Sequence, residues 1–329
     1  MGHRGFVPAV LFLWGIRMKT LILGAGAMGC LFGAKLKQAG YDVTLFNREN
    51  TVIKQIESHG IELTSSDEKE YTIQIPVCYR ESELKKEYEL IIVLVKAFAT
   101  EQVLSKIKHI IDENTVVLSL QNGVGNLEII QEVIPQAIHG IGGTGSGASV
   151  LGPGQIAHRA TGKTNIGLMN DITGKKAEAI SKMLTNAGIE TAVSSNVQSV
   201  IWSKLLINVA FNSLTAVTKL KNGDAILTQD GEKIATKLIE EAVTVAKAEK
   251  IELLYNHPVK EILAIGHKQI ARNQSSMLTD ILNERKTEIE VINGAIAVYG
   301  KRHGISTPYN EMMTELIHII EKSYNIQVK

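Results

Sequence analysis

The sequence predicts an α/β domain followed by an all-α domain, and three observations carry this prediction. From Met18 to about Ala192, short apolar runs alternate with amphipathic stretches, which is typical of strand–helix–strand units around a parallel sheet. A glycine-rich turn directly follows the first of these runs. Beyond Ser194 the pattern changes to long segments of helical periodicity. We therefore expect residues 18–193 to form the sheet domain and residues 194–329 the helical domain, closely apposed because no Pro/Ser-rich linker separates them.

The residues before Met18 form a separate segment. Their apolar stretch, residues 6–14, follows His3 and Arg4 and superficially resembles a secretion signal. It is too short to span a bilayer, and no small-residue cleavage site follows it. We expect residues 1–17 to be a translated upstream extension and Met18 to be the natural start.

Five apolar runs are predicted to be strands of the α/β domain, and each is followed by a turn. The first four turns lead into helix-like stretches, as the crossovers between parallel strands require. Such a sheet brings the residues that follow its strands to one edge. The five predicted strands are residues 19–23, 42–46, 89–95, 115–120 and 137–142.

The turn after the first strand has the glycine fingerprint of a dinucleotide-binding loop, Gly24-Ala25-Gly26-Ala27-Met28-Gly29. The first glycine permits the tight turn, the second lets the backbone approach a pyrophosphate, and the third allows the helix to pack closely on the strand. Amide groups at the helix start then bind the anion. Because the motif lies between a predicted strand and a predicted helix, it predicts a Rossmann-type domain. A tight turn without a ligand is the alternative interpretation.

The end of the second strand indicates which dinucleotide binds. NAD-binding domains usually place an acidic residue here for the ribose hydroxyls, whereas this chain has Asn47 and Arg48. A guanidinium pairs bidentately with a 2′-phosphate, which an acid would repel. We therefore expect NADP(H) as the cofactor. A solvated Arg48 is the alternative, and the neighbouring Glu49 argues for it.

A second glycine-rich run, residues 140–154, precedes a segment that loosely imitates a triphosphate-binding loop. That segment, residues 157–164, begins with Ala157 where the motif needs glycine, and no strong buried strand precedes it. We expect turns at a sheet edge here and no second phosphate site. His158 has no partner at a spacing that marks a metal ligand or a catalytic base.

The second half of the chain reads as a bundle of long helices. Thr307 is suited to cap the last of them, with Pro308 in its first turn. The predicted helices are residues 197–218, 232–249, 258–272, 277–303 and 308–324.

Three polar residues interrupt the first of these helices at intervals of four. Lys204, Asn208 and Asn212 form one stripe, because four residues are about one helical turn. Apolar residues border the stripe, so these polar groups need partners. A hydrogen-bonded network inside a helical bundle is the alternative interpretation. The lysine favours a functional site, because a low-dielectric environment tunes an ammonium for proton transfer.

Two polar residues follow strands of the predicted sheet. Lys96 follows strand 89–95, and Asn122 comes two residues after strand 115–120. Ligands of open parallel sheets bind at the carboxyl ends of the strands, so both side chains are expected near the nicotinamide end of the cofactor. A capping or turn role is the alternative for Asn122.

A carboxylate lies on the apolar face of the predicted helix 277–303. Glu288 shares this face with Ile281 and Val291, and it needs a cation or a hydrogen-bond donor there. We expect Lys204 to be that cation. The pair is either a structural ion pair or a part of the site.

The composition excludes several classes of protein. The chain has 35 Lys and Arg residues against 34 Asp and Glu residues. It therefore lacks the excess of basic residues that is typical of nucleic-acid-binding proteins. Cys30 and Cys78 lie in unrelated contexts, without the spacing of a metal site or a disulfide framework. We expect a cytoplasmic enzyme of small-molecule chemistry that binds no nucleic acid, no membrane and no metal.

Together these residues resemble the ketopantoate reductase (2-dehydropantoate 2-reductase) family, over essentially the whole chain from Met18. The resemblance is carried by the glycine fingerprint and by Val95-Lys96, Gln121-Asn122-Gly123, Trp202-Ser203-Lys204-Leu205 with Asn208 and Asn212, Asn222-Gly223, Ser275-Ser276-Met277 and Thr287-Glu288-Ile289-Glu290-Val291-Ile292-Asn293-Gly294. This chain departs from the family pattern in its N-terminal extension and in small details such as Lys286.

The resemblance implies NADPH-dependent reduction of 2-dehydropantoate to (R)-pantoate, a step toward pantothenate and coenzyme A. It implies that Lys204 is the general acid and that Glu288 holds substrate and lysine in register. It assigns Lys96 and Asn122 to the cofactor and reacting side, where Asn122 also meets the substrate. The other substrate contacts that it implies are Asn208, Asn212, Asn222 and, for the carboxylate, Ser276.

Two other functions remain open at this point. A related NADP-dependent 2-ketoacid or opine-type dehydrogenase would use the same scaffold on another substrate. A noncatalytic dinucleotide sensor is disfavoured, because binding alone needs no paired acid and base facing a substrate cleft between the two domains. The apolar helices either close on one another or contribute to the seam of a homodimer.

Overall fold

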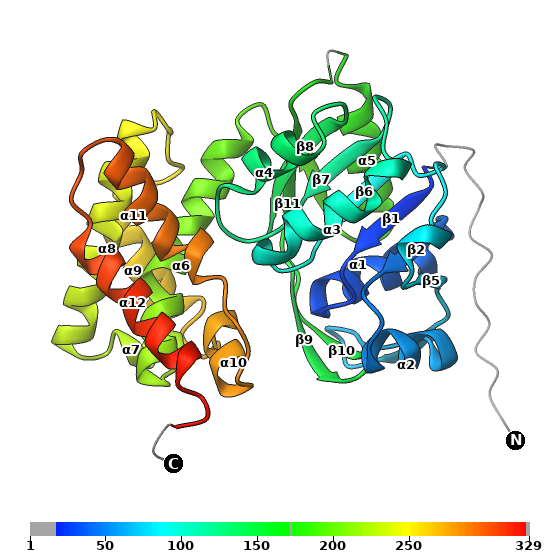
Figure 1. The fold of residues 1–329 in the computed structure, drawn as a ribbon. Coiled ribbons are helices and arrows are strands. Elements are labelled where there is room, and N and C mark those ends of the chain that lie inside the picture. The colour runs from blue at the N-terminus through cyan, green and yellow to red at the C-terminus, as the bar shows by residue number, and fades with distance from the viewer. Residues whose placement is uncertain (1–17, 172, 327–329) are drawn as a thin grey trace, which may run out of the picture.

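The structure, a computed structural model, describes residues 18–171 and 173–326 and consists of an α/β part followed by a helical part (Figure 1). This confirms the α/β plus all-α fold class that the sequence predicts. The predicted extension, residues 1–17, lies outside the described residues.

An eight-stranded sheet forms the centre of the α/β part. Its order is β12-β11-β8-β7-β6-β1-β2-β5, and all neighbours are parallel except β8 and β11. The five predicted strands are confirmed as β1, β2, β6, β7 and β8, whereas β5, β11 and β12 are not predicted. The strands are β1 Thr20–Leu23, β2 Val43–Phe46, β5 Val77–Cys78, β6 Leu90–Val93, β7 Val116–Ser119, β8 Ile138–Thr144, β11 Thr164–Leu168 and β12 Thr191–Val193.

Helices cover both faces of this sheet. Ile22 of β1 belongs to the core cluster that contains Phe32 of α1, while Leu21 and Leu23 belong to a cluster with Leu104 of α3. Because both faces are buried, the strands are continuously apolar rather than alternating. Helices α1 to α4 follow β1, β2, β6 and β7, as predicted. The helices of this part are α1 Ala27–Gln38, α2 Thr51–His59, α3 Thr100–Ile107, α4 Asn126–Val133 and α5 Lys175–Asn186.

A second, four-stranded sheet packs against α1. It is not predicted from the sequence, and its order is β4-β3-β10-β9. Its strands are β3 Ile61–Thr64, β4 Glu70–Ile73, β9 Gly147–Gly152 and β10 Gln155–Ala160. The expectation of turns over residues 140–154 is therefore wrong for most of that run, which forms β8 and β9. Glycine is needed inside β8, because a Cβ at Gly142 would lie 2.6 Å from the carbonyl oxygen of Asn165 on β11.

The helical part is built around α6. This helix contacts α8, α10 and α12 (Figure 1). Among the described residues, α6 is the one helix that has the length and apolar composition of a membrane span. Since 67% of that apolar window is buried inside the protein, α6 has the character of a core helix. The helices are α6 Val197–Thr218, α7 Asn222–Ala225, α8 Gln229–Ala248, α9 Pro258–Lys268, α10 Ser276–Leu282, α11 Asn293–Arg302 and α12 Pro308–Lys322.

The prediction of one continuous helix over residues 277–303 is wrong. Helix α10 ends at Leu282, and α11 begins only after the short 3₁₀ turn η4 (Ile289–Val291). The break is a helix C-cap: Glu284 has φ 52°, and the Arg285 N–H donates back to the Asp280 carbonyl at 2.9 Å. Residues 283–288 are thereby freed from helical geometry.

The α/β and helical parts are joined by close contacts. Strand β12 ends at Val193 and α6 begins at Val197, so the connection is short; the domain division at this point stays a prediction. The Val124 N–H, after β7, donates to the Val291 carbonyl of the helical part at 3.1 Å. Gly123 has φ 83°, and a Cβ there would collide with Val291. Glycine at this position therefore lets the two parts approach backbone to backbone.

Candidate active site

The carboxyl edge of the main sheet faces α6 and the segment between α10 and α11. Three loops leave the sheet at this edge: the glycine loop after β1, the loop with Lys96 after β6, and the loop with Asn122 after β7. The parallel register of β1, β6 and β7 puts these loops side by side. Open parallel sheets bind their ligands at the carboxyl ends of their strands, so a ligand is expected beside these three loops.

The three glycines of the loop have the distinct environments that a dinucleotide requires. Gly24 has φ +106°, and a Cβ there would lie 2.9 Å from the Val95 amide nitrogen. At Gly29 a Cβ would run into the Gly24 carbonyl, so only glycine lets α1 pack this closely on β1. A Cβ at Gly26 meets nothing within 4 Å, so the loop faces open space there. Backbone at the N-terminus of α1 is thus free to approach a pyrophosphate, and the residues present fit a dinucleotide.

Lys204 of α6 reaches the carboxyl edge of the sheet. Its Nζ donates a hydrogen bond to Asn122 Oδ1 at 3.0 Å. Burial lowers the pKa of Lys204 to about 8, and the charge of Glu288 partly opposes this effect. A lysine poised in this range exchanges a proton near neutral pH, as a general acid must.

Glu288 lies across from β6 and binds the loop that follows it. Its Oε1 accepts a hydrogen bond from the Ala97 N–H at 3.3 Å, and its Oε2 lies 3.4 Å from Lys96 Nζ. The expectation that Glu288 pairs directly with Lys204 is therefore wrong, since the ion pair is formed with Lys96. The reason is the break after α10, which moves Glu288 off the predicted helical face and beside the β6 loop. Glu288 acts on Lys204 only through its longer-range charge.

Lys96 is held by two carboxylates of the helical part. Its Nζ lies 2.7 Å from Asp280 Oδ2 in addition to its contact with Glu288. Burial opposes the charge on Lys96, but the two carboxylates outweigh it and raise its pKa. Lys96 is therefore a fixed cation, in contrast to the tuned ammonium of Lys204.

Asp280 is a residue of this cluster that the sequence reasoning missed. It lies on α10 with a side chain only 7% exposed, and its second oxygen is 3.5 Å from Arg285 Nε. The signal that could have found it is the one that identified Glu288: an acidic residue between apolar neighbours, Leu278 and Ile281. Such a carboxylate is expected to have a cationic partner.

The remaining predicted substrate contacts lie on three elements of the helical part. On α6, Asn208 is half-buried and Asn212 is buried, in line with Lys204. Asn222, at the start of α7, is buried, and its Oδ1 has no hydrogen-bond partner among the described residues. An orphaned buried acceptor is costly unless a ligand or water satisfies it.

The two neighbouring serines at the start of α10 differ in their surroundings. Ser275 is buried, accepts a hydrogen bond from the Leu278 N–H at 3.0 Å and lies 2.7 Å from the Thr215 hydroxyl of α6. Ser276 is exposed at the N-terminus of α10. The first serine thus fixes α10 against α6, and the second is left free for a ligand.

The sequences of both parts match one family. The family model described as "Ketopantoate reductase PanE/ApbA" matches residues 20–171, and the one described as "Ketopantoate reductase PanE/ApbA C terminal" matches residues 196–321. The chain belongs to the ketopantoate reductase family. It is an oxidoreductase with the Rossmann-type fold of that family.

Relatives in this family are similar over nearly their whole length. A 2-dehydropantoate 2-reductase of Streptococcus pyogenes serotype M1 is 33% identical, with 94% of this chain and 100% of the relative covered. One of Pyrococcus abyssi is 35% identical, with 91% and 97% covered. Among solved structures, a D-mandelate dehydrogenase with NADH and anilino(oxo)acetate is 32% identical with a TM-score of 0.87, covering 94% of this chain and 100% of that one. The PanE/ApbA family ketopantoate reductase from Ralstonia eutropha JMP134 is 27% identical with a TM-score of 0.86 at the same coverage.

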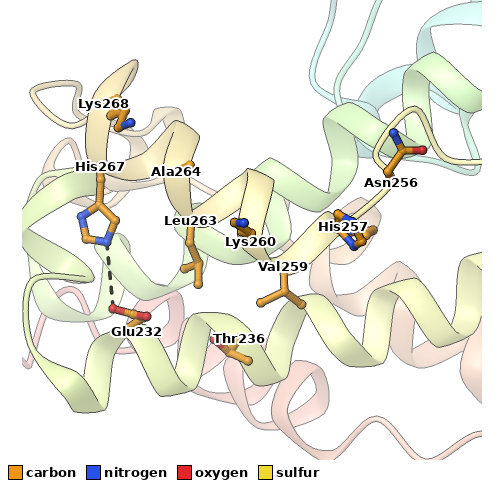
Figure 2. A pocket seen from close by; sticks show the side chains of 11 residues that line it. Glu232, Thr236, Asn256, His257, Val259, Lys260, Leu263, Ala264, His267 and Lys268 are labelled. Atoms are coloured by element: carbon orange, nitrogen blue, oxygen red, sulfur yellow. Dashed lines mark ion pairs between the residues drawn. The ribbon is translucent and has the colours of Figure 1, made fainter.

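A separate groove of this ketopantoate reductase family member lies between α8 and α9. Figure 2 shows Val259 and Leu263 pointing from α9 toward Thr236 of α8. A dashed line joins His267 to Glu232, whose Nε2 and Oε2 atoms lie 4.0 Å apart. None of the predicted site residues lines it. Within residues 18–171 and 173–326, no group of three or more His, Cys, Asp or Glu side chains is arranged to hold a metal ion. This groove is separate from the candidate active site.

Proposed function

We propose that this protein is a cytoplasmic NADPH-dependent 2-dehydropantoate 2-reductase, which forms (R)-pantoate for pantothenate and coenzyme A synthesis. The observation that carries the proposal is the Lys204 ammonium, with its pKa lowered to about 8, bonded to Asn122 at the carboxyl edge of a sheet with a dinucleotide loop. The 2-dehydropantoate 2-reductases among its relatives support this choice of substrate.

NADPH, when bound, supplies the hydride that reduces the ketone carbon. Negative charge then develops on the ketone oxygen, and the Lys204 ammonium stabilises this charge and donates the proton. Asn122 Oδ1 accepts a hydrogen bond from the same ammonium and so orients it. Lys204 is half-buried and desolvation lowers its pKa, so water has limited access to this proton transfer.

Substrate and cofactor contacts are proposed on the two sides of the Lys204 ammonium. The glycine loop holds the pyrophosphate, Arg48 the 2′-phosphate, and Lys96 with Asn122 the nicotinamide side. The proposed substrate contacts are Asn122, Asn208, Asn212, Asn222 and, for the carboxylate, Ser276. Glu288 holds the β6 loop through the Ala97 N–H and keeps a negative charge near the reacting ammonium.

One observation favours a second candidate function. The D-mandelate dehydrogenase solved with NADH and anilino(oxo)acetate has the same fold at 32% identity. A reductase of another 2-ketoacid, with NADH in place of NADPH, is therefore the alternative. Both functions use the same general acid, and they differ in the substrate and in the 2′-phosphate.

The two functions are separated by following the oxidation of NADPH and of NADH with a panel of 2-ketoacids. The panel contains 2-dehydropantoate, phenylglyoxylate, 2-ketoisovalerate and pyruvate. We expect the highest kcat/KM with NADPH and 2-dehydropantoate. Turnover only with another ketoacid would replace the substrate, and binding of NADPH without turnover of any ketoacid would remove the enzyme proposal.

The pH dependence of turnover follows from the pKa of Lys204. In ketoacid reduction the protonated form is active, so kcat/KM, which reports the free enzyme, should fall as the pH rises through about 8, by about tenfold for each further unit. In the reverse oxidation the neutral amine is the active form, so kcat/KM should rise over the same range. The measurement is a pair of pH profiles at constant ionic strength. A reduction rate that stays constant to pH 10 would exclude Lys204 as the acid.

A further inference from the structure

Strand β5 lies directly beside β2, and the residues that follow the two strands leave the sheet together. The register pairs Phe46 with Cys78, and the Asn47 N–H donates to the Cys78 carbonyl at 3.2 Å. Arg48 and Arg80 therefore occupy equivalent positions, each two residues beyond this pair. Neighbouring strands lie about 4.8 Å apart, so both side chains start from the same short stretch of the sheet edge.

The guanidinium of Arg80 is oriented but weakly held. Its Cζ lies 5.5 Å from the centre of the Tyr79 ring, and its Nη1 lies 3.1 Å from Glu83 Oε1. The Arg80 side chain is 62% exposed, and exposed ion pairs of this kind are weak. Stacking on Tyr79 limits the orientations of the guanidinium, while the single carboxylate leaves it available to a stronger anion.

The acidic neighbour of Arg48 has a cationic partner of its own, Lys54. Glu49 Oε1 lies 2.7 Å from Lys54 Nζ, at the start of α2. The pKa of Glu49 is lowered, chiefly by the hydrogen bond and charge of Lys54 and further by the charge of Arg80. The charge of Arg80 is the smallest of these causes, and it acts at the residue that directly follows Arg48. In the sequence alone, Glu49 argues against a 2′-phosphate beside Arg48. In the structure Glu49 is paired with Lys54, and Arg48 and Arg80 lie in the same region.

We infer that Arg80 is a second specificity-determining residue for the 2′-phosphate of NADP(H), acting with Arg48 from the adjacent strand. The inference rests on the proposed use of NADP(H). A phosphate monoester carries a charge of about −1.5 to −2 and three acceptor oxygens, so it has room for two guanidinium groups. In this arrangement the phosphate takes the place of Glu83 as the anionic partner of Arg80.

The inference is tested by titrating the full-length protein with NADPH and with NADH, without ketoacid, and recording fluorescence. The two ligands differ only in the 2′-phosphate. Arg80→Gln is expected to weaken NADPH binding by about tenfold and to leave the Kd of NADH within about twofold. Arg80→Lys keeps the charge without the bidentate geometry, and it should fall between the wild type and Arg80→Gln. The matched control is Arg159→Gln, an exposed arginine on β10 bonded to Ser149, which should leave both Kd values unchanged.

The outcomes separate this inference from the cofactor proposal. If the wild type binds NADPH no more tightly than NADH, the proposed NADP(H) preference is itself wrong. A second outcome is that the wild type prefers NADPH and that Arg48→Gln reduces this preference, while Arg80→Gln does not. That outcome overturns only the role of Arg80. An equal loss for NADPH and NADH in Arg80→Gln would also overturn it, since the effect would then not depend on the 2′-phosphate.

Discussion

Replacing Lys204 with methionine is expected to lower kcat for ketoacid reduction by about 10²- to 10⁴-fold, the usual contribution of a positioned general acid. Methionine fills a similar volume without an ammonium, so the packing of α6 should persist. The Lys204 ammonium meets the ketone oxygen as charge develops there, so kcat and kcat/KM should fall together. The Kd of NADPH, measured by fluorescence titration, should change by less than about threefold.

The control for this variant is Lys237→Met, on the exposed face of α8. Lys237 pairs with Glu240 at 2.8 Å and is not one of the residues of the candidate active site, so its replacement should leave kcat unchanged. The pH profile gives a second readout, because Lys204→Met should lose the decline of reduction above pH 8. Wild-type kcat in Lys204→Met would remove this lysine from the mechanism.

The parts of the site that the sequence predicts are those encoded by local periodicity or by a motif. The glycine loop is recognisable because a strand and a helix flank it, and α6 is recognisable because its polar stripe repeats every four residues. Lys96 and Asn122 follow from the rule that ligands bind at the carboxyl ends of parallel strands. None of these inferences requires knowledge of a contact between distant residues.

What the sequence alone does not predict depends on such contacts. The helix-like pattern of residues 277–303 hides the C-cap at Glu284, a residue type with no special preference for positive φ. The pairing of Lys96 with Asp280 joins residues far apart in the chain, and nothing in the periodicity of either segment specifies it. The small sheet is missed for a similar reason, because β3 and β10 pair in parallel across a long separation. Propensity was overruled by tertiary packing in these places.

The wrong prediction about Glu288 leads to a sharper expectation. Glu288 contacts Lys96 and the Ala97 N–H, yet its charge still raises the pKa of Lys204 against the effect of burial. Glu288→Gln keeps an oxygen acceptor for Ala97 but removes this charge. The pKa of Lys204 should then fall below its present value of about 8, and the decline of reduction with pH should begin at a lower pH.

We expect kcat/KM of Glu288→Gln at pH 8 to fall by about 10²-fold, because two effects add. Less of Lys204 is protonated, and Lys96 keeps Asp280 as its one carboxylate partner, which weakens the hold on the β6 loop. The matched control is Glu290→Gln, two residues along the chain, whose exposed carboxylate pairs with His318 at 2.8 Å and should leave kcat unchanged. The loss of Lys204 protonation is reversed at low pH, whereas the weaker hold on the β6 loop is not. The loss should therefore shrink as the pH falls to 6, and a loss independent of pH would show that Glu288 acts only through the β6 loop.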